Sequence, residues 1–308
     1  MDTDMNMKIS RPTSASLPAG FSLLELVFVC AILSLVLAGV FNWVSLVIQR
    51  SSAEQTKVDL TQEGREFVDE FERDLHQAGY PNCRIVKIPG STACPADPTV
   101  NPSEAMSSTV AVGLVSVSNT QVIFEGDVDG NGTVDIVVYR LVDSAKNYPP
   151  TGNCPCTIQR SQMPKVNGTL PIPANELATA TFSQELNNVV NSGVPAGTNP
   201  YGGGLLIAGN TAWGASNSAY YAAVSTFKDY PVFQAYDQYG NIIQLNPAVD
   251  ISTTGGVQKL TCDVASVNCV KSIRLTINLL ANATTGLDLK TNTRPVTTLV
   301  GNARLVNN

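Results

Sequence analysis

The chain has 308 residues, a net charge of -6, 14% charged residues and a single histidine, His76. A net negative charge gives no electrostatic footprint for a polyanion, which argues against nucleic-acid binding. One histidine excludes most metal sites and most general-base arrangements that depend on imidazole.

Residues 1–20 form a short polar segment with two prolines, Pro12 and Pro18, which disfavour a helix. From Phe21 to Ile48 the sequence is apolar, and this run exceeds the roughly 20 residues that a helix needs to cross a bilayer. The run is also longer than the apolar region of about 7–15 residues in an ordinary secretory signal. We therefore predict a membrane-spanning helix that begins at Phe21.

One acidic residue, Glu25, interrupts the apolar run near its start. An acidic side chain costs about 2.5–3.5 kcal/mol at the bilayer centre, and less near a helix end where it reaches the interface. A tolerated interfacial glutamate is therefore one interpretation. The other is a partner charge, because cleavage before Phe21 would create an α-amino group one helical turn from Glu25. The two opposite charges would neutralise each other, within one chain or between neighbours.

The junction LPAG followed by FSLLEL, residues 17–26, resembles the class III signal of type IV prepilins and pseudopilins. In that family a prepilin peptidase cuts after the glycine and methylates the new N-terminal residue. The resemblance assigns Gly20 to the position before the cut and Phe21 to the methylated terminus. It assigns Glu25 to the glutamate that pairs with the terminal amine of an adjacent subunit. A competing cut by signal peptidase I after Ala38 would release a soluble protein, but it leaves Glu25 and the Gly-Phe junction unexplained.

A helical pattern continues beyond Arg50, and no proline occurs between Pro18 and Pro81. Gly79, two residues before Pro81, predicts the end of this helix near Gln77. Apolar residues at helical spacing predict a stripe that packs on a globular domain. They are Leu60, Phe67, Val68, Phe71, Leu75 and Ala78. The rest of the surface is predicted to be acidic, with Glu54, Asp59, Glu63, Glu66, Asp69, Glu70, Glu72 and Asp74.

The residues at the end of this helix resemble one subfamily in particular. Arg65, Asp74-Leu75, Ala78-Gly79-Tyr80 and Cys83 are similar to the pattern of PilW-type minor pilins. The J-type minor pseudopilin of type II secretion is similar here but usually lacks the Gly-Tyr and cysteine ending. The resemblance implies an α+β fold, in which a long N-terminal helical spine packs against an antiparallel β-sheet head. The expected parts are a leader (1–20), a transmembrane and filament-core helix (21–48), the amphipathic second half of the helix (49–80) and a β-rich head (81–308).

The remainder of the chain has few helix signals and many short β-rich runs separated by Gly, Asn, Asp and Pro. We expect an antiparallel sheet that packs on the amphipathic half of the helix. The predicted strands are Thr109–Val117, Thr120–Glu125, Val134–Val142, Pro231–Tyr236, Ile242–Leu245 and Ser272–Leu280. The C-terminal run, residues 302–307, is similar to the terminal strand of PilW-type proteins.

Between two predicted strands, oxygen-bearing side chains recur at every second position, with a glycine at the sixth, as in a calcium loop of the EF-hand type. The twelfth position, where such a loop has a bidentate glutamate, is Val138. The alternative is a β-hairpin whose Asp-Gly and Asn-Gly steps supply the turn geometry. The candidate calcium ligands are Asp127, Asp129, Asn131, Thr133 and Asp135.

Six of the seven cysteines lie outside the apolar run, and an even number of them predicts disulfides and an oxidising compartment. The seventh, Cys30, is expected to be a small buried apolar residue. Zinc fits less well, because the Cys154-Pro-Cys156 spacing is wrong for a zinc knuckle and no histidine lies nearby. The disulfide candidates are Cys83, Cys94, Cys154, Cys156, Cys262 and Cys269.

Six cysteines allow about 15 pairings, and the sequence does not choose among them. Short loops favour Cys83 with Cys94 and Cys262 with Cys269. Cys154 and Cys156 would then bond each other in a strained ring. A separate feature is residues 186–227, which contain no charged side chain. We expect a long, poorly ordered insertion there, with a sticky tip loop as the alternative.

The resemblance implies a structural subunit rather than an enzyme, which helps to start or cap a type IV pilus and supports adhesion, motility or DNA uptake. It implies prepilin peptidase, other major and minor pilins and the inner-membrane assembly platform as partners, and a head in the periplasm that later reaches the pilus. No cofactor is required, and Ca²⁺ at the 127–135 loop is the only candidate. A pseudopilin of type II secretion is the alternative of the same architecture. A periplasmic hydrolase or binding protein with an uncleaved anchor would need a convergent polar pocket, and the sequence has no nucleophile elbow or phosphate loop to build one.

Overall fold

The computed structural model describes residues 22–86, 101–143, 145–150, 155–191, 231–245, 247–260, 262, 268–281 and 296–306. The chain divides into two compact units, residues 1–48 and residues 49–308, and each is described by itself below. The predicted junction between Gly20 and Phe21 lies outside the described residues.

A single long helix, α1, covers Leu23–His76 and confirms the long N-terminal helix expected from the sequence. Its last turn tightens, because Gln77 N and Ala78 N donate to the carbonyls of Asp74 and Leu75. Gly79 then takes a positive φ of 79°, which ends the helix as glycine commonly does. The predicted stop at Gly79 and Pro81 is therefore confirmed.

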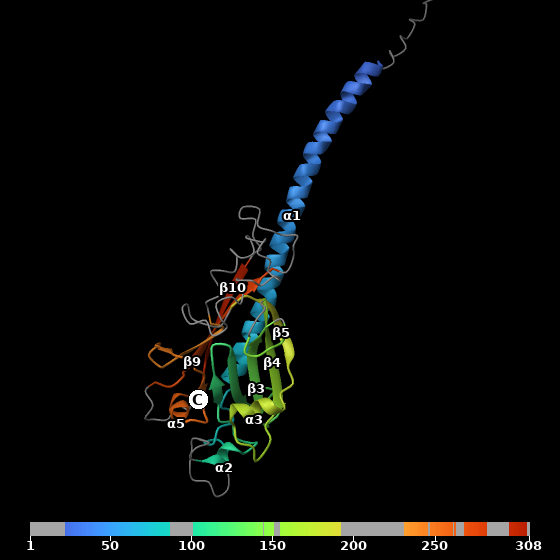
Figure 1. The fold of residues 1–308 in the computed structure, drawn as a ribbon. Coiled ribbons are helices and arrows are strands. Elements are labelled where there is room, and N and C mark those ends of the chain that lie inside the picture. Colours follow the sequence, from blue (N-terminus) through green and yellow to red (C-terminus); the bar gives the residue numbers. More distant parts are fainter. Residues whose placement is uncertain are drawn as a thin grey trace, which may run out of the picture. The chain divides into compact units, whose positions relative to one another are not determined.

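The strands form an antiparallel sheet in the order β7-β6-β9-β5-β4-β3-β2-β1-β8, with β10 paired to β9 outside this path. Figure 1 shows β3, β4 and β5 side by side, with β9 and β10 further along the sheet. The strand bounds are β1 Leu114–Val117, β2 Gln121–Gly126, β3 Asp135–Val142, β4 Cys156–Pro164, β5 Ser183–Val189, β6 Phe233–Tyr236, β7 Ile242–Ile243, β8 Val249–Asp250, β9 Ser272–Leu280 and β10 Val296–Arg304. The chain is thus an α+β protein, as predicted.

Several elements were not expected from the sequence. Strands β4 and β5 carry many polar residues, since β4 reads CTIQRSQMP and β5 reads SQELNNV, so neither has the apolar run of a typical strand signal. The closing strand begins at Val296, earlier than the predicted 302–307, and ends at Arg304. Strand β5 also includes the first residues of the predicted 186–227 insertion, and residues 192–227 lie outside the described part. The short helices, also missed, are α2 (Pro102–Ala105), α3 (Pro173–Ala178) and α5 (Thr254–Leu260).

The second half of α1 packs on the sheet within the 49–308 unit. All six residues of the predicted apolar stripe are buried, so the stripe is confirmed. Phe71 lies at its centre, with its ring centroid 5.2 Å from that of Tyr139 on β3 and 5.6 Å from that of Phe233 on β6. Burying large aromatic side chains contributes much of the free energy that holds an element on a sheet. The core of the head is therefore shared between α1 and the sheet.

Candidate functional site

The first described residue of the N-terminal segment is Ser22, whose carbonyl accepts a hydrogen bond of 3.1 Å from Leu26 N. Glu25 lies in the first turn of α1 and is exposed. Free N–H groups and the helix dipole favour a negative charge in this turn. The amino group of Phe21, its predicted partner, lies outside the described residues, so the charge pair stays a prediction.

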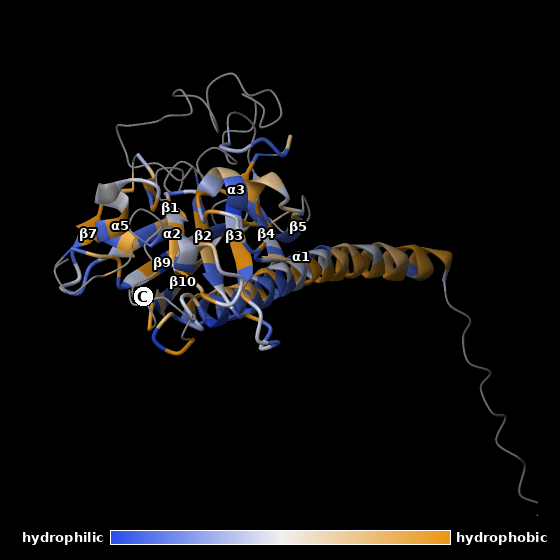
Figure 2. Cartoon of the chain, turned by 90° about the horizontal axis from the view of Figure 1, so that it is seen from below, coloured by the Kyte–Doolittle hydropathy of each residue, from blue (hydrophilic) through white to orange (hydrophobic). Residues whose placement is uncertain are grey.

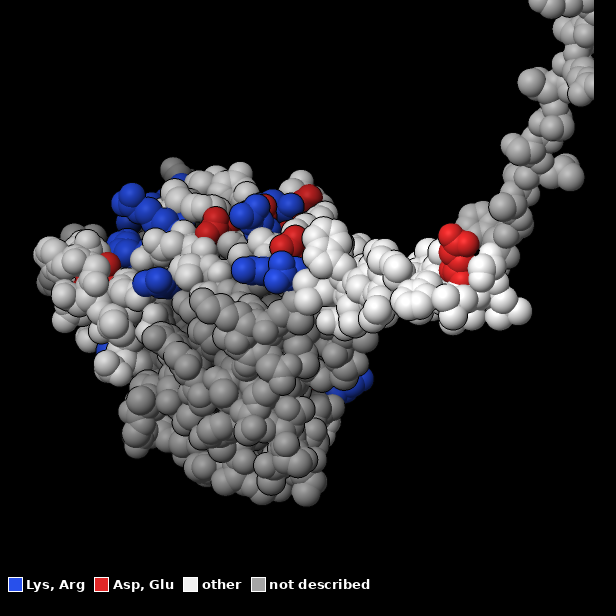
Figure 3. Space-filling model, turned by 90° about the horizontal axis from the view of Figure 1, so that it is seen from above, with Lys and Arg blue, Asp and Glu red and all other residues white. Residues whose placement is uncertain are grey.

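The N-terminal half of α1 exposes a continuous apolar surface. Leu23 is 81% exposed, Phe41 is 69% exposed and Trp43 is 72% exposed, so apolar side chains project on more than one side of the helix. Among the described residues, α1 is the one helix long and apolar enough to cross a membrane. Figure 2 shows apolar colouring along this half, and Figure 3 shows its visible surface almost free of charged groups. An exposed apolar area of this extent marks contact with a membrane or with another protein.

Cys30 is a free thiol on this exposed surface. The expectation that it is buried is therefore wrong for the single chain, because its helix face has no packing partner among the described residues. A lipid or a neighbouring helix would have to supply that cover.

A buried polar cluster joins the second half of α1 to the sheet. Asp74 is only 2% exposed, and its Oδ2 accepts hydrogen bonds from Tyr139 Oη (2.7 Å) and from Arg160 Nε (2.9 Å). Arg160 Nη2 lies 2.7 Å from the same oxygen, and its Nε lies 3.5 Å from Glu70 Oε1. Burial and the adjacent Asp74 carboxylate raise the pKa of Tyr139, so its phenol stays protonated and donates. The prediction that Asp74 lies on the acidic outer surface is wrong, because β3 and β4 supply two donors for it.

The helix and the sheet approach closely at Gly64 and Gly126, where an added Cβ would meet a flexible side chain in the first case and backbone in the second. A Cβ at Gly64 of α1 would lie 2.0 Å from Leu299 Cδ1 of β10, and a Cβ at Gly126 would lie 2.3 Å from the carbonyl oxygen of Gln77. Next to Gly126, Asp127 N donates to Tyr80 O at 2.7 Å. The chain after α1 is thus tied to the end of β2 by backbone contacts that admit no side chain.

The side-chain oxygens of the loop between β2 and β3 accept hydrogen bonds from groups of the loop itself. Asp127 Oδ1 accepts from Asn131 N and its Oδ2 accepts from Gly132 N, both at 3.0 Å. Asp129 Oδ1 accepts from Asn131 N at 3.1 Å, and Asn131 Oδ1 accepts from the backbone and the hydroxyl of Thr133. These bonds are those of a tight turn, which suits the hairpin interpretation.

The last candidate ligand, Asp135, accepts a hydrogen bond of 2.9 Å from Gln162 Nε2. Burial raises the pKa of Asp135, the hydrogen bond from Gln162 opposes that shift, and the charges of Asp129 and Asp127 add to it. Within the residues that the structure describes, no three His, Cys, Asp or Glu side chains are arranged to hold a metal ion. Calcium binding at this loop stays a prediction.

Cys262 and Cys269 form a disulfide. Cys83 and Cys156 are also disulfide-bonded. Cys94 and Cys154 lie outside the described residues, so the pairings of Cys83 and Cys156 stay predictions.

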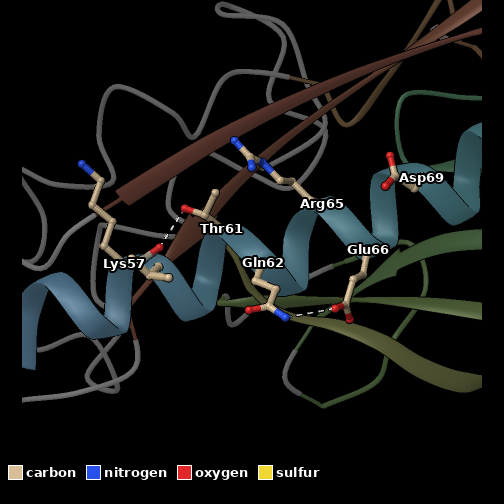
Figure 4. Close-up of a pocket in the computed structure, with 7 residues that line it drawn as sticks. Lys57, Thr61, Gln62, Arg65, Glu66 and Asp69 are labelled. Carbon is tan, nitrogen blue, oxygen red and sulfur yellow. Dashed lines mark hydrogen bonds between the residues drawn. The ribbon is translucent and has the colours of Figure 1, made fainter.

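A shallow pocket opens on the second half of α1, and Figure 4 shows its polar side chains spread along successive turns rather than pointing to one centre. Gln62 Nε2 donates to Glu66 Oε1 at 3.4 Å, and Thr61 Oγ1 donates to the carbonyl of Lys57 at 2.7 Å. Such neighbours on a helix face form ordinary local pairs. The described lining residues are Lys57, Val58, Thr61, Gln62, Arg65, Glu66 and Asp69.

Residues 18–41 match a family model described as the prokaryotic N-terminal methylation motif. The match spans the Gly20–Phe21 junction, Glu25 and most of the apolar run, and it supports a type IV pilin-like or pseudopilin precursor. It implies processing by prepilin peptidase and suggests membrane anchoring and a structural rather than an enzymatic subunit. No protein of curated function and no solved structure matches the chain.

Proposed function

We propose that the chain is a minor pilin of the PilW type, which joins a type IV pilus at its initiation or at its tip and supports adhesion, motility or DNA uptake. The observation that carries the proposal is the exposed apolar half of α1 with one acidic residue, Glu25, in its first turn, within a match to the N-terminal methylation motif. A simple anchor needs no acidic residue there, whereas a subunit that pairs with a neighbour's amino terminus does.

The proposed path starts with a precursor in the inner membrane whose head lies in the periplasm. Prepilin peptidase cuts between Gly20 and Phe21 and methylates Phe21. The apolar half of α1 then leaves the membrane and packs against the same segment of other pilins. This transfer is favourable where close packing between helices replaces looser contact with lipid and Glu25 gains a positive partner.

The mass of the mature N-terminus tests the first step. We expect a chain that begins with a methylated Phe21 when the protein is expressed with prepilin peptidase, and an intact leader when the peptidase gene is deleted. A start at Gly39, or a leader that remains attached in the presence of the peptidase, would contradict the proposal.

A deletion strain separates the pilus from the secretion alternative. A minor pilin predicts loss of surface pili with normal secretion of exoproteins. A J-type pseudopilin predicts the reverse. Complementation with the wild-type gene should restore whichever phenotype appears.

A further inference from the structure

A second cluster of buried charges lies away from the N-terminal segment, at the end of the sheet where Figure 1 shows α2 and α3. Its members are Lys165, just after β4, Glu125 on β2 and Glu176 on α3, which are 6%, 0% and 2% exposed. Glu104 on α2 is a further buried carboxyl in this region. Buried charges are costly unless each is paired and hydrogen-bonded.

The ammonium of Lys165 has three hydrogens, and three acceptors take them. Lys165 Nζ donates to Ala105 O at 2.7 Å, to Val110 O at 2.9 Å and to Glu125 Oε2 at 2.6 Å. Glu125 Oε2 also accepts from Val112 N at 2.9 Å. Lys165 therefore has no hydrogen left for Glu176.

Two oxygens in the cluster, Glu125 Oε1 and Glu176 Oε2, have no hydrogen-bond partner among the residues that the structure describes. Both are acceptors when their carboxyls are ionised, so neither satisfies the other in that state. One proton changes this, because a protonated Glu176 is a donor and Glu125 Oε1 is an acceptor without a donor. In the described part of the chain, the Oε2 of Glu104 is also without a partner.

The electrostatics favour placing that proton on Glu176. Burial, followed by the neighbouring Glu125 carboxylate, raises the pKa of Glu176 to about 8, although Lys165 opposes the shift. Burial also raises the pKa of Glu125, but the charge and hydrogen bond of Lys165 and the N–H of Val112 favour its ionised form. Glu125 Oε2 accepts from two donors, whereas Glu176 Oε2 has no donor among the described residues.

We propose that Glu176 is protonated at neutral pH and donates its O–H to Glu125 Oε1, so that one proton holds α3 on the end of the sheet. Loss of this proton places a second negative charge beside Glu125, and Lys165, whose three hydrogens are already donated, has none left to compensate it. The segment around α3 then loosens from β2 and β4. The contact between α3 and the sheet is thus a latch, in the sense that it holds when Glu176 is protonated and is lost in alkaline medium.

The direction of the pH effect follows from the two states of Glu176. In the unfolded chain its pKa returns to the ordinary value of 4.5, below the folded value of about 8. The folded state therefore binds this proton more tightly. The stability that it contributes is fully present below pH 4.5 and is lost as the pH rises through about 8.

Denaturant unfolding of the full chain in detergent tests the latch. Glu176→Gln keeps an N–H donor for Glu125 but does not titrate at this site. We expect the folding equilibrium constant of this variant, relative to wild type, to rise by up to about tenfold per pH unit between the two pKa values. Glu54→Gln, an exposed change on α1, should follow the wild-type profile at every pH. Parallel profiles for wild type and Glu176→Gln would overturn the proposal.

Hydrogen exchange tests the proposal on the wild-type protein, so its result does not depend on whether a variant folds. After correction for the intrinsic rate, the amides of residues 174–178 should lose protection progressively as the pH rises from about 4.5 to about 8, while those of β3 stay protected. A carbon NMR titration of glutamate-labelled protein should show one carboxyl that releases its proton near pH 8. Unchanged protection of α3, or glutamates that all titrate in the acid range, would overturn the proposal.

Discussion

The phenol of Tyr139 on β3 donates a 2.7 Å hydrogen bond to Asp74 Oδ2 on α1, and both residues are buried. This contact lies beside the aromatic packing of Phe71 against Tyr139, so one side chain supplies both apolar and polar contacts to the helix. It helps to hold the second half of α1 in its rotation on the sheet, since a turn of the helix would move Asp74 away from Tyr139.

Tyr139→Phe should lower the free energy of unfolding by about 1–2 kcal/mol, because Asp74 loses one donor while the ring packing remains. Asp74→Ala should cost more, about 3 kcal/mol, because Arg160 then keeps one longer ion pair, with Glu70, and neutral partners in Gln162 and Tyr139. Denaturant unfolding measures both. Arg73→Ala is the matched control, since Arg73 is 70% exposed and its Nε lies 4.0 Å from Asp74 Oδ1. A wild-type midpoint for Tyr139→Phe would show that the hydrogen bond does not stabilise the fold.

Gly126→Ala should destabilise the head by about 1–3 kcal/mol, because its new methyl group would lie 2.3 Å from the backbone oxygen of Gln77. Backbone cannot move aside as a flexible side chain can. Gly255→Ala on α5 is the control, since a Cβ there meets nothing within 4 Å and alanine favours a helix. The midpoint temperature of thermal unfolding should therefore fall for Gly126→Ala. For Gly255→Ala it should stay unchanged or rise. Equal shifts would contradict the close approach of the helix end and β2.

The sequence predicted α1 and its buried stripe well, because both depend on local spacing of apolar residues. It placed Asp74 wrongly because its partners lie far along the chain, Tyr139 at a separation of 65 residues and Arg160 at 86. A carboxylate that directly follows Arg73 and the acidic residues of α1 has the local pattern of a surface residue. Its burial follows only from the pairing of β3 with β4.

The strands also fall into those that the local sequence predicts and those that depend on distant neighbours. Runs such as Ser272–Leu280 were predicted because their apolar residues are dense, whereas β5 is held by its neighbours in the sheet despite a polar sequence. The cluster of Lys165, Glu125 and Glu176 gave no sequence signal, since its members come from three elements. At the N-terminus the sequence alone reveals the candidate site, because that site is a linear motif and needs no tertiary contact.

Calcium binding at the 127–135 loop should be weak, in about the 10⁻⁴–10⁻³ M range, because loop N–H groups compete for its oxygens and Val138 replaces the bidentate glutamate. Isothermal titration of the full chain with calcium chloride measures it. Asp129→Asn should abolish the heat of binding, while Asp59→Asn on α1 should not change it. No heat at millimolar calcium would leave the loop as a hairpin turn only.

Glu25→Ala should leave cleavage and methylation intact but strongly reduce incorporation into filaments. The peptidase acts on the junction before Phe21, whereas assembly buries the new amino group in an apolar bundle. Without the glutamate that ammonium is unpaired, and an uncompensated buried charge costs about 3–5 kcal/mol. Glu25→Gln should fail in the same way, because the amide keeps its size but not the charge.

Immunoblots of sheared filaments and of membranes measure how this protein is distributed, and the mass of the N-terminus confirms that each variant is processed. Glu54→Ala is the matched control, since it removes an exposed acidic residue from the same helix beyond the apolar run. We expect it to reach filaments as wild type does. If Glu25→Ala also did so, the terminal amine would need no partner, and the acidic residue in the first turn of α1 would be explained by the helix dipole and the membrane interface alone.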